Sequence, residues 1–352
     1  IAERARSILA LGPESLDQAI AKAVDEAYET SQGLGASEES NLVGELRSAL
    51  SGYGQLDDLV ANPAIEEIWI NSPNEVFIYE NSRTKRVGIR LTDSEVRQAV
   101  ERMLRDSGRR LDRSEPFVDA TLANGSRLHV VIPDVTREHW SVNIRKFPNR
   151  VYSLQDLVSL GSISFAMSEY LKTKFLAGVN ILVSGATQAG KTTMLCALLD
   201  VGAKTERLIS VEETFEIRTN YIDWVAMQAR QANLEGVGEI TLRRLVKEAL
   251  RMRPTRLVIG EVRQAEALDL LIALNSGIAG LCTIHANSAF DALEKLKLLP
   301  LLAGENIPSL FVSQTVDRTI GLVVHCEFSN GNRRVAQVIE ATSPGSWNEV
   351  QL

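Results

Sequence analysis

Eight consecutive residues have the spacing of a loop that holds phosphate. They are Gly185, Ala186, Thr187, Gln188, Ala189, Gly190, Lys191 and Thr192, and they fit the pattern G-x-x-x-x-G-K-[ST]. The glycines permit a tight turn whose backbone N–H groups point inward, and the lysine brings a positive charge to the β- and γ-phosphates. The final threonine hydroxyl is a ligand for Mg²⁺. The segment therefore predicts a site for ATP and Mg²⁺, with Thr193 as a further contact.

The flanking sequence gives this loop the setting that phosphate binding needs. A short apolar run at 180–184 predicts a strand before the loop, and 193–199 predicts a helix after it. The loop then ends at a helix N-terminus, which favours an anion by roughly 0.3–1 kcal/mol even when exposed. Binding of nucleotide does not by itself imply hydrolysis, which needs further groups.

One candidate for hydrolysis is Glu261, which follows an apolar strand predicted at 256–260. The carboxyl ends of parallel strands meet at one edge of a sheet, where the phosphate loop also lies. A carboxylate there can orient the attacking water or hold Mg²⁺.

A second acidic group, Glu212 and Glu213, follows a strand predicted at 208–211. Adjacent carboxylates are costly unless a cation lies between them, so Mg²⁺ is a reasonable partner. Alternation along the strand end allows only one of the two to face the site, and we favour Glu212. The predicted metal ligands are therefore Thr192, Glu212 and Glu261.

His285 follows a third predicted strand, at 281–284. From that position its imidazole could contact the γ-phosphate or bridge to a carboxylate. Three other histidines, His129, His139 and His325, have no such setting, and we assign them no role.

Changes in the pattern of apolar and polar residues divide the chain into four parts. We expect an N-terminal helical segment at 1–54, a small α+β domain at 55–147, a linker at 148–161 and an ATPase domain at 162–352. In the first part, apolar spacing predicts helices at 15–29 and 38–51.

In the α+β domain, alternating residues predict strands at 65–70, 75–80, 117–122, 127–132 and 142–147. Thr92 followed by Glu95 is a capping box for a helix at 92–105. Asn124-Gly125 is a hairpin turn signal.

From 162 onward, strands alternate with helices, which predicts an α/β fold with a parallel sheet. The last strands, at 320–328 and 333–342, flank a turn and predict a closing antiparallel hairpin.

Charge and composition narrow the function further. The net charge of −7 and pI of about 5.4 argue against a nucleic-acid partner, which requires a basic surface. A basic cluster at Arg251, Arg253 and Arg256 leaves two alternatives open: ion pairing within the protein, or a role at the nucleotide.

The remaining composition points to a protein of the cytoplasm. The 3 cysteines are far apart and form no C-x-x-C pair, so we expect reduced, buried thiols and no zinc site. No apolar run reaches the ~18 residues of a membrane-spanning helix. The first residues contain no signal-peptide core. Because the sequence lacks an initial methionine, we expect it to be a fragment.

Several longer segments, taken in order, resemble one family. With the phosphate loop, they are Leu122–Arg127 (LANGSR), Asn143–Phe147 (NIRKF), Val211–Thr214 (VEET), Asn233–Glu239 (NLEGVGE), Ala249–Pro254 (ALRMRP), Gly260–Arg263 (GEVR) and Thr283–Asn287 (TIHAN). The chain resembles the secretion ATPases of type II and type IV secretion and type IV pili. The closest likeness is to the tight-adherence (Flp) pilus and conjugation-type members, over roughly residues 56–342.

The resemblance implies a RecA-like C-terminal domain behind a small PAS-like domain, with nucleotide between them. It implies a homohexamer at the cytoplasmic face of the inner membrane, working on a polytopic platform protein without inserting in the membrane itself. It places Glu212 and Glu213 in the family's Asp box, Glu261 at the Walker B glutamate and His285 in the His box. Arg127 and Arg145 match arginines that reach the phosphates from the N-terminal domain.

The chain departs from the family pattern at several places. Glu213 replaces the usual aspartate of the Asp box, and Thr255 stands where an aspartate often follows Arg-Pro. The residues before the His box are Ser276-Gly277-Ile278-Ala279-Gly280, which lack two polar groups. Gln188-Ala189 replaces a common Gly-Ser, and the four-cysteine zinc motif of many type II members is absent.

The sequence therefore predicts an ATP-hydrolysing hexameric motor for pilus assembly or protein secretion across the bacterial envelope. The alternative is a nucleotide-gated assembly scaffold with very slow turnover, which the altered Asp and His boxes motivate. A RecA-like nucleic-acid translocase is a third possibility, against which the acidic pI speaks.

Overall fold

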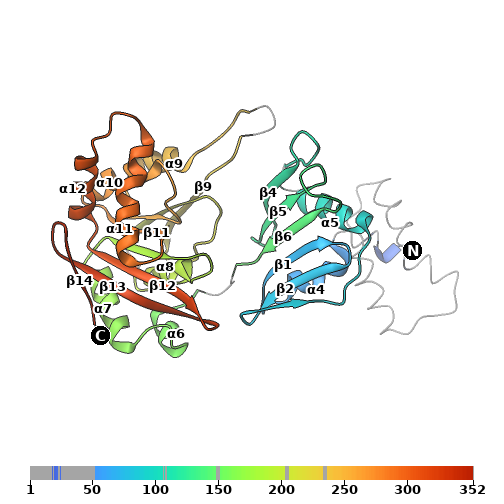
Figure 1. The fold of residues 1–352 in the computed structure, drawn as a ribbon, viewed down its shortest axis with the longest axis horizontal. Coiled ribbons are helices and arrows are strands. Elements are labelled where there is room, and N and C mark those ends of the chain that lie inside the picture. The colour runs from blue at the N-terminus through green and yellow to red at the C-terminus, as the bar shows by residue number, and fades with distance from the viewer. Residues whose placement is uncertain are drawn as a thin grey trace. The chain divides into compact units, whose positions relative to one another are not determined.

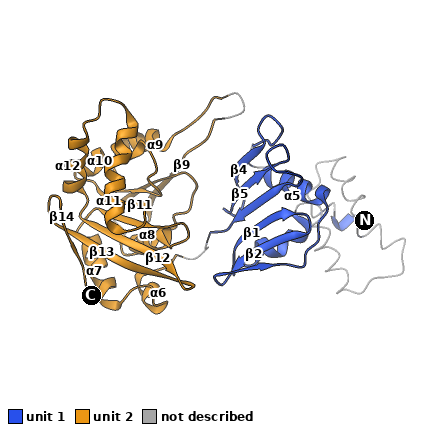
Figure 2. Ribbon diagram, in the orientation of Figure 1, with its two compact units in different colours: residues 1–148 blue, residues 149–352 orange. Residues whose placement is uncertain are grey.

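The computed structural model describes residues 52–351 except 106, 108, 148–150, 203–205 and 233–235, together with 18, 20–22 and 24. The chain divides into two compact units, 1–148 and 149–352 (Figure 2). The helices predicted at 15–29 and 38–51 lie outside the described residues, apart from the few helical positions at 18–24.

The first unit is built on an antiparallel sheet of 6 strands in the order β3-β2-β1-β6-β5-β4. Its elements are η1 (Gly54–Leu56), α4 (Asp57–Ala61), β1 (Ile65–Ser72), β2 (Glu75–Glu80), β3 (Arg83–Arg86), α5 (Asp93–Arg105), β4 (Phe117–Thr121), β5 (Arg127–Val131) and β6 (Ser141–Arg145). All five strands predicted for this domain are confirmed, and β3 was not predicted.

Local signals account for this unit's elements. Thr92 Oγ1 accepts the N–H of Glu95 at 3.2 Å, and the Glu95 carboxylate accepts the N–H of Thr92 at 2.7 Å, so the capping box before α5 is confirmed. Gly125, in the turn between β4 and β5, has φ +83°, which glycine adopts without steric cost. Alternate residues of β1, such as Ile68 and Ile70, are buried beneath α5 in one apolar core.

The second unit is built on a sheet of 8 strands in the order β14-β13-β12-β7-β11-β10-β8-β9. Its strands are β7 (Ile181–Gly185), β8 (Arg207–Glu212), β9 (Asp223–Gln228), β10 (Arg256–Ile259), β11 (Ala279–His285), β12 (Leu322–Ser329), β13 (Asn332–Ser343) and β14 (Ser346–Glu349). The run from β12 to β9 is parallel, and β13 and β14 are antiparallel. The predicted parallel sheet and closing hairpin are confirmed.

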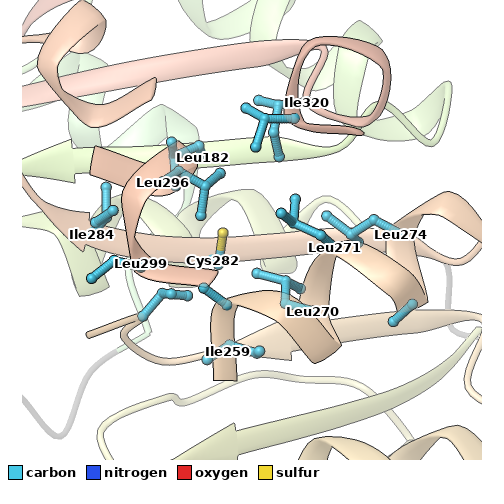
Figure 3. Close-up of a cluster of buried hydrophobic side chains, with 14 of the residues drawn as sticks. Leu182, Ile259, Leu270, Leu271, Leu274, Cys282, Ile284, Leu296, Leu299 and Ile320 are labelled. Atoms are coloured by element: carbon cyan, nitrogen blue, oxygen red, sulfur yellow. The ribbon is translucent and has the colours of Figure 1, made fainter. Parts of the chain in front are cut away.

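Helices cover both faces of this sheet (Figure 1). They are α6 (Leu154–Ser159), α7 (Phe165–Leu176), α8 (Lys191–Asp200), α9 (Leu242–Ala249), α10 (Glu266–Asn275), α11 (Ala289–Leu298) and α12 (Ser309–Thr319), with η2 (Leu250–Met252) and η3 (Leu299–Ala303). One core lies on the side of α9–α12, and Figure 3 shows part of it around Cys282, with Leu182, Ile259 and Leu270 close by. The other core lies on the side of α6–α8.

The segment predicted as a linker, 148–161, contains helix α6. Ser153 and Asp156 form a capping box, because the Ser153 hydroxyl accepts the Asp156 N–H while the Asp156 carboxylate accepts the Ser153 N–H. Leu154 and Leu157 are buried in the core of the second unit. Part of the segment therefore packs onto that unit.

Two further sequence predictions are settled by the fold. All three cysteines are free and buried, as predicted. Arg256 of the basic cluster is 1% exposed, bonds to Glu206 at 3.0 Å and lies 3.8 Å from the ring centroid of Phe175, so it serves an internal ion pair. Within the described part of the chain, no helix is both long and apolar enough to span a bilayer.

Candidate active site

The phosphate loop joins β7 to α8 with the backbone that its sequence predicts. Gly185 (φ +150°), Gln188 (φ +63°) and Gly190 (φ +92°) have positive φ, which turns the chain into a concave loop. A Cβ on Gly185 would lie 2.3 Å from the carbonyl oxygen of Cys326 on β12, so only glycine fits there. Helix α8 begins after Gly190 with no side-chain cap from that residue, and a helix N-terminus of this kind favours an anion.

Lys191 lies inside the loop rather than in solvent. Its side chain is 8% exposed, and Nζ donates to the Ala186 carbonyl oxygen at 2.8 Å. Nζ also lies 3.2 Å from Nδ1 of His285. The ammonium is thus held at the mouth of the loop, where β- and γ-phosphates would be bound.

His285 lies between Lys191 and Glu261. It is the last residue of β11 and pairs in register with Gly185 at the end of β7. Burial, followed by the positive charge of Lys191, lowers the pKa of His285, so the ring is neutral at pH 7. An ammonium only donates, so Nδ1 accepts from Lys191 and the ring proton is assigned to Nε2.

Glu261 follows β10 and faces this histidine. His285 Nε2 lies 3.0 Å from Glu261 Oε1, yet that buried oxygen has no aligned hydrogen-bond donor. Glu261 Oε2 accepts from Arg263 at 2.7 Å. Burial pushes the pKa of Glu261 up, but the hydrogen bond and charge of Arg263 outweigh it and hold the pKa below its ordinary value. Glu261 is therefore an ionised carboxylate whose Oε1 faces the His285 ring and whose Oε2 is held by Arg263.

The two neighbouring glutamates after β8 have different surroundings. Glu212 is 2% exposed, and its Oε2 accepts the N–H groups of Glu216 and Ile217 at 2.7 and 2.8 Å. Its Oε1 is buried and has no hydrogen-bond partner. Burial raises the pKa of Glu212 to about 7. Glu213, by contrast, is exposed.

These strand ends carry a recognisable set of groups, and comparison with known proteins identifies their family. The family described as "Type II/IV secretion system protein" matches residues 50–345 of the chain. The chain belongs to this family. Its members are secretion ATPases, so this chain is an ATPase and binds nucleotide.

Individual relatives agree with this assignment. A putative conjugal transfer protein of Mycobacterium tuberculosis is 35% identical over 301 residues, which cover 83% of this chain and 85% of the relative. Among solved structures, the ATPase DotB of Yersinia pseudotuberculosis matches with a TM-score of 0.59 at 15% identity, covering 82% of this chain and 78% of that one. The pilus retraction motor PilT with bound ADP matches with a TM-score of 0.54 at 17% identity, covering 78% of each chain. At these identities the two structures support the α/β fold alone.

The oxygen ligands beside the loop are consistent with a nucleotide-bound Mg²⁺. The Thr192 hydroxyl lies 3.3 Å from a carboxylate oxygen of Glu216. No group of three or more His, Cys, Asp or Glu side chains suited to a metal occurs among the described residues. Mg²⁺ commonly takes only one or two protein ligands beside phosphates and water, so this pair suffices. Thr192 and Glu216 would hold the ion, which would neutralise charge on the phosphates.

The predicted metal set of Thr192, Glu212 and Glu261 stays a prediction. In the structure the Thr192 hydroxyl contacts Glu216, Glu212 accepts backbone N–H groups of the following turn, and Glu261 lies against His285. Glu216 follows β8 in an irregular segment, where no periodicity in the sequence tells which carboxylate turns toward the loop.

Arg127 and Arg145 lie in the first unit, directly opposite each other on β5 and β6. They line a pocket of about 250 Å³ together with Asp119, His129 and Asn143. Asp119 accepts from Arg127 at 3.1 Å and lies 3.1 Å from His129 Nδ1. Like charges directly opposite on neighbouring strands are destabilising, and the Asp119 carboxylate against Arg127 offsets part of this repulsion.

Three contacts of the site were not predicted. Arg263 holds Glu261, Lys295 of α11 donates to the His285 carbonyl oxygen at 2.9 Å, and Arg333 of β13 donates to the Gln188 carbonyl oxygen at 2.9 Å. Arg263 follows Glu261 by two residues and belongs to a segment that the sequence already singled out. The other two come from distant parts of the chain and carry no local signal.

Proposed function

We propose that this secretion ATPase is a hexameric motor that hydrolyses ATP to power pilus assembly or protein secretion across a bacterial envelope. The observation that carries the proposal is the set Lys191–His285–Glu261 at the ends of adjacent strands. An ionised carboxylate lies one imidazole away from the lysine of the phosphate loop. Such a group can orient and deprotonate the attacking water.

In this proposal Lys191 and the loop N–H groups bind the phosphates, and Thr192 with Glu216 holds Mg²⁺. Glu261 is the base, and Arg263 keeps it ionised by holding its pKa low. His285 contacts the γ-phosphate, Glu213 adds negative charge near the metal, and Glu212 shapes the turn that presents Glu216.

We propose Arg127 and Arg145 of the first unit as the groups that neutralise charge on the phosphates, the role that the family resemblance implies for them. Their side-by-side charges and the pocket they line support a role in neutralising phosphate charge. The motor would act on a polytopic platform protein at the cytoplasmic face of the inner membrane. Within the family, we favour the tight-adherence pilus and conjugation-type branch.

The alternative of a nucleotide-gated scaffold is favoured by one observation. Glu212 of the Asp box is buried and bonded to backbone, with a pKa raised to about 7 by burial. A half-protonated carboxyl in that position would contribute little to metal binding, and turnover would be slow.

Native mass and steady-state ATP hydrolysis, measured together with and without Mg²⁺, test the motor against the scaffold. The motor predicts a six-subunit mass with nucleotide and turnover that stops when EDTA removes Mg²⁺. The scaffold predicts the same mass with tight ATP binding and near-zero turnover. A monomer that hydrolyses no ATP under any of these conditions would contradict both.

A further inference from the structure

Strand β12 pairs with β7 up to Cys326 and continues to Ser329, so the hairpin of β12 and β13, both labelled in Figure 1, extends past the end of β7. Cys326 of β12 pairs in register with Gly185, the last residue of β7. The hairpin turns through Asn330 (φ +53°) and Gly331 (φ +79°), the left-handed pair of a tight two-residue turn. Because the turn is this short, Arg333 lies opposite Phe328, in the second residue pair counted from the turn.

A bulge decides which face of the sheet Arg333 occupies. Cys326 pairs with Val335, but His325 pairs with Gln337, so one residue of β13 is extra at this point. Because side chains alternate, the extra residue moves Val335 to the same face as Val338, which is the face covered by α8. Arg333 lies two residues before Val335 and shares that face, which is the face from which the loop enters α8.

At this position Arg333 contacts the phosphate loop through its Nε, which donates to the Gln188 carbonyl oxygen at 2.9 Å. Its aliphatic stem lies beside Gly190, where an added Cβ would be 3.5 Å from the Arg333 Cδ. The Phe328 ring lies 5.4 Å below the guanidinium carbon and limits its movement.

Arg333 bonds to Gln188, a residue of the loop whose backbone conformation is strained. Gln188 has φ +63°, a left-handed conformation that is unfavourable for a residue with a Cβ. A loop of this shape needs its carbonyl groups turned outward so that its N–H groups point inward. A charged donor on the outside favours that arrangement before any ligand arrives.

We propose that Arg333 is a positioning residue that braces the strained phosphate loop at Gln188 in its phosphate-binding shape. The inference rests on the proposed function, since it assumes that the loop binds ATP. The brace raises the fraction of molecules whose loop is ready to bind, and apparent affinity scales with that fraction. Arg333 then acts on nucleotide affinity and much less on the chemical step.

The test compares Arg333→Met, which keeps the aliphatic stem over Phe328 and removes the donor, with Arg334→Met. Arg334 is the matched control, because it lies on the opposite face and pairs with Glu327 in solvent. We expect Arg333→Met to weaken ADP and ATP binding about tenfold, the effect of one lost charge-assisted hydrogen bond, with kcat changed less than about threefold. Arg334→Met should leave both unchanged.

The Gln188→Gly substitution distinguishes a brace on the loop from a general structural role of Arg333, because only the brace predicts a smaller loss of nucleotide binding in that background. Glycine adopts the left-handed conformation freely, so the loop should need the brace less. In a Gln188→Gly background we expect Arg333→Met to weaken binding by less than about threefold. An unchanged tenfold penalty would overturn the inference, and so would equal binding by the Arg333→Met and Arg334→Met proteins.

Hydrogen exchange of the loop amides separates failure of this inference from failure of the proposed function. In the nucleotide-free protein, Arg333→Met should speed exchange at 186–190 and Arg334→Met should not. If the parent binds no nucleotide, the proposed function fails while this exchange difference still decides the brace. If Arg333→Met does not fold, Arg333→Gln, which shortens the side chain, takes its place under the same criteria.

Discussion

Glu212 should make this protein less stable as the pH rises from about 4.5 to about 7. The carboxyl is 2% exposed, one oxygen has no hydrogen-bond partner, and burial raises its pKa from 4.5 to about 7. A group whose folded pKa lies above its unfolded pKa binds protons more tightly in the native state, so stability falls as pH rises between the two values. The cost of the buried charge is absent below about pH 4.5 and complete above about pH 7.

Replacing Glu212 by Gln removes that cost while keeping the shape of the side chain. The interval from 4.5 to about 7 corresponds to about 3 kcal/mol, at 1.36 kcal/mol per pH unit. The Glu212→Gln protein should therefore gain on the parent by up to about 3 kcal/mol at pH 8, and by almost none of this at pH 4.5. The two N–H donors of Glu216 and Ile217 keep an acceptor in the amide oxygen.

Urea unfolding of the parent and Glu212→Gln, in nucleotide-free buffer with EDTA from pH 5 to 8, measures this difference. Glu305→Gln is the control, because Glu305 is exposed and its substitution should give a flat difference. A difference between Glu212→Gln and parent that does not change with pH would refute the reasoning. A difference that grows in the opposite direction would mean that the carboxylate is stabilised by a donor near Oε1.

Two other substitutions test the packing that surrounds the site. A Cβ on Gly260 would lie 2.9 Å from Cγ of Glu212, so Gly260→Ala should lower stability by about 1–3 kcal/mol in thermal unfolding. In the Glu212→Ala background Gly260→Ala should cost markedly less stability. If the destabilisations of Gly260→Ala and Glu212→Ala simply add in the double variant, the predicted clash between the two side chains is wrong. Arg256→Ala should cost about 3 kcal/mol, because it removes a buried ion pair with Glu206 and the contact with Phe175. Arg251→Ala, whose pair with Glu248 is exposed, should stay within about 0.5 kcal/mol in the same denaturation experiment, and equal losses would refute the distinction.

The ends of the core strands could be predicted from sequence because the signals there are local. A run of apolar residues followed by a polar one specifies a strand end, and parallel strands bring such ends to one edge. Gly185, Glu261 and His285 were expected together on this ground, and the structure brings them together through Lys191.

What could not be predicted depends on contacts between distant segments. Arg333 reaches the loop only because a bulge in β13 moves it to the face of α8, and no local pattern announces that bulge. Glu216 contacts Thr192 from an irregular turn whose shape depends on the buried Glu212. The edge strands β3, β9 and β14 are partly polar and exposed, so their alternation is weak.

The central claim is that Glu261 activates water beside a phosphate loop held by Lys191. ATP binding and ATP turnover, measured on the parent, Glu261→Gln and Lys191→Ala, test it most directly. Glu261→Gln should bind ATP about as tightly as the parent and turn over at least about 100-fold more slowly, while Lys191→Ala should lose binding. Turnover by Glu261→Gln at the parent's rate would contradict the account.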